Sequence, residues 1–122
     1  HSLCNDKRRK EMATGRLETP IAVGNVLGAN TTVYTVPVGS YAVCNVSLTN
    51  TTTTAVTVRI ALATNAATPG IAEYIEYDTV IAGKGVFERT GLVMQAGLNL
   101  VAVASVNASL SATVYGIETS IT

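Results

Sequence analysis

The sequence predicts an all-β protein: a single β-sandwich or jelly-roll-like domain of seven or eight antiparallel strands, preceded by an extended N-terminal arm. Three observations predict this class. Apolar and polar residues alternate along residues 41–49 and again along 55–63, and a period of two places each apolar set on one face of an extended strand. Turn residues separate further short strands at intervals of roughly 8–12 residues. No segment shows a convincing amphipathic helical period.

The composition fits one globular domain. The chain has 122 residues, of which 48% are hydrophobic and 13% charged, with a formal net charge of zero. A disordered chain would hold fewer apolar and more charged residues. No apolar run approaches the ~20 residues that a membrane helix needs, and the charged beginning of the chain is unlike a signal peptide. Aromatic residues are scarce, so the core is expected to be mainly aliphatic.

Residues 1–30 are expected to form an N-terminal arm or tail, and residues 31–122 the β-sandwich domain. Four of the eight basic residues lie in the run KRRK at 7–10, and the only histidine is His1. Met12 opens a stretch that looks like a natural beginning, so residues 1–11 are expected to be a solvated tail or to lie upstream of the natural start. An ordered docking arm and a nucleic-acid contact are the alternatives for this basic run.

The strands of the body are each bounded by turn residues. Residues 17–27 alternate only loosely, and Pro20 marks an edge or a connector. Pro37 and Gly39 form a turn, Pro69-Gly70 a loop, and Asn107-Ala108 the last hairpin. In chain order, the expected strands span 31–36, 41–49, 55–63, 74–81, 86–91, 98–106 and 109–118.

The strand at 98–106 is apolar on both faces. Val101 and Val103 alternate with Leu100, Ala102 and Ala104. Only one face of a strand reaches the core of a small sandwich, so the outer face is expected to contact another chain. The alternative is a central strand covered by the N-terminal segment.

The two cysteines are expected to stay unpaired. Cys44 lies on the inward face of its strand, where a free thiol behaves as a small apolar residue. Cys4 lies in the polar leader, 40 positions away, so a disulfide would tie a tail to a core position. The sequence therefore shows no disulfide framework.

No catalytic, cofactor-binding or metal-binding residues are predicted. A Ser-His or Cys-His pair would need the tail residue His1 to reach the body, and a zinc site needs clustered cysteine and histidine, which the sequence lacks. One acidic group stands out, in which Glu76 and Asp78 share a strand face and Glu88 lies across a hairpin from them, with Glu73 nearby. Carboxylates so placed could hold calcium, but a solvated face balanced by nearby basic residues is favoured. Four glycosylation sequons are expected to be incidental: Asn30, Asn45, Asn50 and Asn107.

Several segments in a fixed order resemble the small β-sandwich virion structural proteins of tailed bacteriophages, including those of cyanophages. The order runs TVYTVPVGSYAVCNVSLTNTTTTAVTVRIALA, then AEYIEYDTVIAGKGVFERTGLVMQAG, then LVAVASVNASLSATVYGIE. The resemblance covers residues 31–118, and none of its segments is a catalytic motif. The first 30 residues lie outside it.

The resemblance implies a non-enzymatic protein of the virion, made in the cytoplasm of the bacterial host. It would be a capsid decoration protein or a neck, tail or fibre component, assembling through sandwich contacts and a docking arm. The implied partners are further copies of the chain in a homo-oligomer and other virion proteins (major capsid, neck or tail), without nucleic acid, membrane or cofactor. The alternative is a receptor- or carbohydrate-binding sandwich at a fibre tip, with Tyr74 and Tyr77 as candidate contacts.

Overall fold

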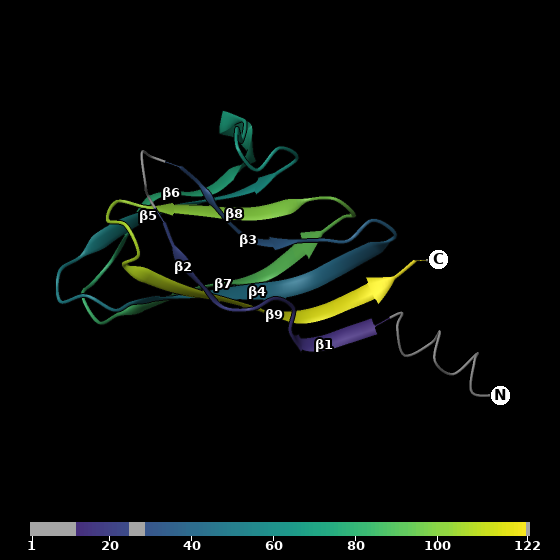
Figure 1. The fold of residues 1–122 in the computed structure, drawn as a ribbon, viewed down its shortest axis with the longest axis horizontal. Coiled ribbons are helices and arrows are strands. Elements are labelled where there is room, and N and C mark those ends of the chain that lie inside the picture. The colour runs from purple at the N-terminus through teal and green to yellow at the C-terminus, as the bar shows by residue number, and fades with distance from the viewer. Residues whose placement is uncertain (1–11, 25–28, 122) are drawn as a thin grey trace.

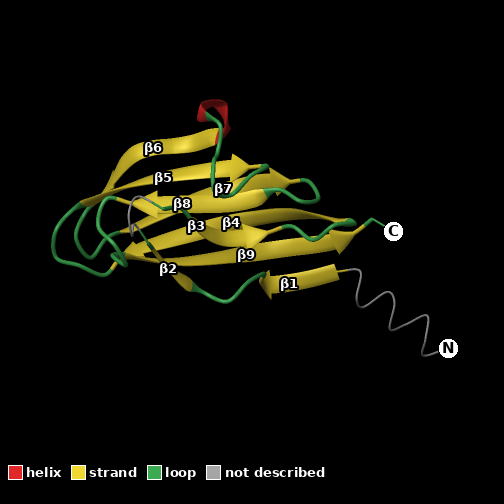
Figure 2. Cartoon of the chain, turned by 45° about the horizontal axis from the view of Figure 1, so that its top comes forward, coloured by secondary structure: helices red, strands yellow, loops and turns green. Residues whose placement is uncertain are grey.

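The computed structural model describes residues 12–24 and 29–121. These residues form nine strands in two antiparallel sheets that pack face to face, with one short 3₁₀ turn and no α-helix (Figures 1 and 2). The strands are β1 (Met12–Arg16), β2 (Ile21–Val23), β3 (Thr31–Thr35), β4 (Ser40–Asn50), β5 (Val56–Ala63), β6 (Tyr74–Ile81), β7 (Val86–Met94), β8 (Asn99–Ala104) and β9 (Leu110–Ser120), with the 3₁₀ turn η2 at Ile71–Glu73.

The strand order is that of a jelly roll. Sheet A has the order β1-β9-β4-β7 with β2 also beside β9, and sheet B has the order β3-β8-β5-β6. Strands pair as nested hairpins: β5 with β6, β4 with β7, β3 with β8 and β2 with β9. A long antiparallel ribbon rolled up in this way gives the two sheets of a jelly roll. The predicted fold class is therefore confirmed.

The described part of the chain has nine strands, not the expected seven or eight, because the segment expected to be an arm supplies two. β1 pairs with β9 from Met12 opposite Thr119 to Arg16 opposite Tyr115, and β2 pairs with the beginning of β9. Neither segment alternates between apolar and polar residues, so only the pairing with β9 defines these two strands. Residues 1–11 lie outside the described residues, and a domain boundary at residue 31 stays a prediction.

The core lies between the sheets and is almost entirely aliphatic. In β4 the residues alternate between buried and more exposed positions along the strand, as its sequence predicts. The largest fully buried side chains come from both sheets and include Leu48, Ile60, Met94, Leu100 and Leu110. Burying one such side chain stabilises the fold by about 1.5–3 kcal/mol, so this layer holds the two sheets together.

The outer face of β8 was expected to contact another chain, but the same chain covers it at Val101, whereas Val103 is only half-buried. β8 lies between β3 and β5, and Val101 is only 1% exposed. It packs in a second small cluster with Ala61 and Ala63, against which Ala66 and Tyr74 lie. The segment after β5 therefore folds over sheet B, which the sequence pattern of β8 could not reveal.

Cys44 is buried on the inner face of β4, as predicted, with its thiol 3.8 Å from the Met94 sulfur. Burial raises the pKa of this thiol from the usual 9.0 to about 11, because a thiolate would lose its hydration among apolar side chains.

This shift makes the free energy of unfolding dependent on alkaline pH. The neutral thiol is favoured in the folded state, so its contribution is complete below about pH 9 and is lost as the pH rises toward 11. In that window the wild type is expected to lose up to about 1.4 kcal/mol per pH unit relative to Cys44→Ala. Urea unfolding of both proteins at pH 8 to 11 measures the difference. If the free energy of unfolding depended on pH equally in both proteins, this expectation would be contradicted.

Candidate interaction surface

Each carboxylate of the predicted acidic group has a partner within the chain. Asp78 forms a two-point ion pair with Arg59, at 2.7 and 3.1 Å, which lowers the pKa of the carboxyl. Glu73 accepts hydrogen bonds from the backbone N–H groups of Gly70 and Thr64, which likewise lower its pKa. No group of three or more potential metal ligands occurs among the described residues. The favoured interpretation, a solvated and internally balanced surface, fits this geometry.

The expected arrangement of this group is wrong in two respects. Asp78 has a left-handed backbone conformation (φ 57°), and the pairing of β5 with β6 shifts register on either side of Ile60. Glu76 is consequently opposite inward-facing Ile60, whereas Asp78 meets Arg59 on the outer side. Irregular backbone breaks the period of two, so the two carboxylates do not share a face.

Glu88 does not lie across a hairpin from Glu76 and Asp78. The turn after β6 carries the chain from sheet B to sheet A, so β6 and β7 do not pair. Glu88 instead accepts a hydrogen bond of 2.6 Å from the Tyr115 hydroxyl, which raises the pKa of the tyrosine. Arg89 of β7 reaches the other sheet, where it donates to the Ile75 carbonyl oxygen and to Glu76. This pair links the two sheet edges on that side.

The two tyrosines considered for carbohydrate binding contact each other on sheet B. Their rings meet edge to face with centroids 5.2 Å apart. The Arg59 guanidinium lies 4.0 Å from the centroid of the Tyr77 ring, a distance typical of a cation–π contact. Sugar rings stack on open aromatic faces, and this contact occupies one face of Tyr77. The described geometry therefore gives a carbohydrate site little support here.

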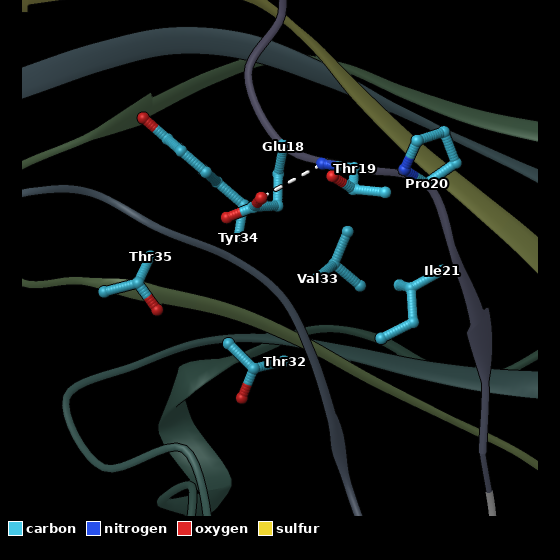
Figure 3. Close-up of a pocket in the computed structure, with 8 residues that line it drawn as sticks. All are labelled: Glu18, Thr19, Pro20, Ile21, Thr32, Val33, Tyr34 and Thr35. Carbon is cyan, nitrogen blue, oxygen red and sulfur yellow. Dashed lines mark hydrogen bonds between the residues drawn. The ribbon is translucent and has the colours of Figure 1, made fainter.

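A groove of about 270 Å³ opens between the β1–β2 connector and the free edge of β3 (Figure 3). Its volume is slightly below the range of small-molecule sites. The lining residues are Glu18, Thr19, Pro20, Ile21, Thr32, Val33, Tyr34 and Thr35. Burial, and then the hydrogen bond that the Tyr34 hydroxyl donates to Glu118, raise the pKa of Tyr34 far above its usual range. The neutral form of this hydroxyl is therefore favoured.

The outer face of sheet A carries exposed apolar side chains in one row. Val43 of β4 is directly opposite Ile117 of β9 on one side and Val93 of β7 on the other. These side chains are 44%, 45% and 69% exposed, and Tyr41 is 41% exposed two residues before Val43. Side chains directly opposite on neighbouring strands touch. The row is therefore a continuous apolar strip, which we call the valine row (Val43, Val93, Ile117).

Sequence reasoning missed the valine row and placed the apolar outer face on β8 instead. One signal was present: Val43 interrupts an otherwise polar outward set of Tyr41, Asn45, Ser47 and Thr49. Val93 was hidden because the expected strand ended at residue 91, whereas β7 continues to Met94. Only the pairing of three strands distant in sequence brings these residues into one row.

Comparisons with known proteins do not assign the chain to a family. No protein family and no curated protein matches it. A chain in the structure of infectious bursal disease virus Gx strain is 12% identical, with a TM-score of 0.45. A chain in the cyanophage Pam1 capsid asymmetric unit is 17% identical, with a TM-score of 0.43. Each match covers 88% of this chain. The matched region spans 31% of the virus chain and 84% of the cyanophage chain.

No helix among the described residues has the length and hydrophobicity to span a membrane. The described residues form a jelly-roll domain, and most of its acidic side chains have partners within the fold. Its most distinctive surface feature is the valine row on sheet A.

Proposed function

We propose that this chain is a non-enzymatic structural protein of a tailed-phage virion, serving as a capsid decoration protein or a neck or tail component. It assembles through lateral contacts of its sandwich and through an N-terminal docking arm. The observation that carries the proposal is the valine row, because three β-branched apolar side chains in one exposed strip favour contact with another protein surface.

Two further features support the proposal. The order of segments along residues 31–118 resembles small virion proteins of tailed phages. The jelly roll is an architecture that viral capsid domains use, although lectins use it as well and a fold does not define a function. The contact between Arg59 and Tyr77 favours the structural role over carbohydrate binding.

The proposal predicts that the protein is a stoichiometric component of phage particles. Particles of the phage that encodes the chain, purified on a density gradient and analysed by quantitative mass spectrometry, are expected to contain it at a constant copy number. Its absence from intact particles would contradict the structural role.

The docking arm is tested separately by deleting residues 1–11. This deletion keeps β1 and β2, whereas removal of residues 1–30 would also strip both strands from β9. The shortened protein is expected to enter particles at less than about half the wild-type copy number, with the same thermal unfolding temperature. Equal incorporation would rule out residues 1–11 as a docking element and would leave the sandwich contacts in place.

A further inference from the structure

We propose that the outer face of sheet A binds the same face of a second copy of this chain, around a two-fold axis that runs parallel to the strands. The inference deepens the proposed function, because it names the partner and the geometry of one lateral contact. It rests on the valine row, on the size of the face and on the placement of two charged residues.

The face is large enough for a stable dimer. β4 and β9 are each 11 residues long, with β7 (9 residues) and β1 (5 residues) on either side. At about 3.4 Å per residue and 4.8 Å between strands, these elements cover about 600 Å² in projection. Specific interfaces bury about 600–1,000 Å² per partner, so the face reaches this range when nearly all of it is covered.

The composition of the face also suits a second copy. Around the valine row, the outward positions of β4 and β9 hold uncharged residues: Tyr41, Asn45, Ser47, Thr49, Ser111, Thr113, Tyr115 and Thr119. A partner with strong charge of one sign would find no complementary charge on this face. An identical face is equally uncharged around its valine row and therefore matches it. Two sheets packed face to face in an aligned manner lie about 10 Å apart, with their side chains interdigitated.

Two charges near opposite edges of the face select the direction of the axis. Arg16 lies on β1, opposite Tyr115, and Glu88 lies on β7, opposite Ser47. The hydrogen bond from Tyr115 draws the Glu88 carboxylate toward the row of Arg16. Arg16 forms no ion pair with any other described residue.

A two-fold axis parallel to the strands lays the β1 edge of one copy over the β7 edge of the other. Arg16 then faces Glu88 of the second copy, and symmetry makes this contact twice. An in-plane axis perpendicular to the strands would instead lay β1 over β1 and β7 over β7, so that like charges face each other. Charge complementarity therefore favours the parallel axis.

The experiment is sedimentation equilibrium of the full chain and its variants. The wild type is expected to be a dimer at about 50 μM, and Val43→Asp is expected to raise the dissociation constant at least ten-fold, because it places a charge at the centre of the face. The matched control is Val80→Asp on sheet B, where the valine is 66% exposed and the dissociation constant should not change. Should Val43→Asp unfold, Val93→Asp tests the same row at a more exposed position.

A charge swap tests the axis. Arg16→Glu and Glu88→Arg are each expected to weaken the dimer about three-fold, and the double variant to restore it to within two-fold of the wild type. Additive losses in the double variant would overturn the parallel axis. A wild type that stays monomeric at 50 μM, or a dimer equally sensitive to Val80→Asp, would overturn the whole inference.

The outcomes separate this inference from the proposed function. A monomer in solution that is still a stoichiometric component of particles would refute the face-to-face dimer and leave the virion role intact. A dimer that depends on Val43, in a protein that is absent from particles, would support the face-to-face dimer and refute the virion role.

Discussion

The Gly116→Ala variant is expected to lose about 4 kcal/mol of unfolding free energy, because it adds a backbone clash to a strained backbone conformation. Gly116 lies in the middle of β9, opposite Cys44 of β4. Its φ of 153° is a value that residues with a side chain rarely adopt, and an added Cβ would lie 2.7 Å from the Cys44 Cα and still closer to the Val43 carbonyl oxygen. Both neighbours are backbone atoms, which cannot move aside without separating two strands.

Urea denaturation at pH 7 measures this loss, with the slope against urea expected to stay unchanged. Gly97→Ala is the matched control. Gly97 also has a positive φ, of 80°, but nothing lies within 4 Å of an added Cβ. Its loss should therefore reflect backbone strain alone, at about 1 kcal/mol. Equal losses in the two variants would contradict the close approach of β4 and β9 at Gly116.

Asn50→Ala is expected to lose about 3 kcal/mol of unfolding free energy, because this fully buried side chain ties the β4–β5 connection to the end of β6. Its amide group donates to the carbonyl oxygens of Thr54 and Ile81, at 2.9 and 3.1 Å, and its oxygen accepts from the backbone N–H and the hydroxyl of Thr52. Alanine would leave buried polar groups without partners, at about 1–3 kcal/mol for each group that water cannot reach.

Two further variants isolate the role of the Asn50 amide. Asn65→Ala removes an exposed side chain that accepts a single hydrogen bond, from the Ala67 backbone N–H at 3.0 Å, and should cost less than about 1 kcal/mol. Asn50→Asp keeps the shape but directs a charge at two carbonyl oxygens. The pKa of that carboxyl should rise, so the loss should be greater at pH 7 than at pH 4. A pH-independent loss would mean that water reaches the site.

Local pattern was sufficient to predict most of the body of the fold. The seven strands from β3 to β9 correspond to the seven expected segments, because turn residues bound each segment and most segments alternate between apolar and polar residues. β1 and β2 were missed because neither MATGR nor IAV alternates between apolar and polar residues. Asn50 was interpreted only as a sequon, since its burial and its hydrogen bond to the Ile81 carbonyl oxygen depend on where β6 ends.

The surface was predicted less well than the core. The prediction that Glu76 and Asp78 share one strand face was wrong, because a left-handed residue at position 78 interrupts the alternation. The expected apolar outer face fell on β8, where a loop from the same chain covers Val101. Burial by a loop and shifts of register both depend on contacts between segments distant in sequence, and no local period records them.

The sequence by itself determined that this chain is all-β, that its core is aliphatic and that Cys44 lies inside, since these properties follow from alternation along single strands. Tertiary structure alone decided which strands are neighbours. It rolled the chain so that Val43, Val93 and Ile117, separated by up to 74 positions, form one row. The physical reason is that a strand's own residues fix which faces it presents, whereas the neighbours of each face are fixed by backbone hydrogen bonds between distant strands.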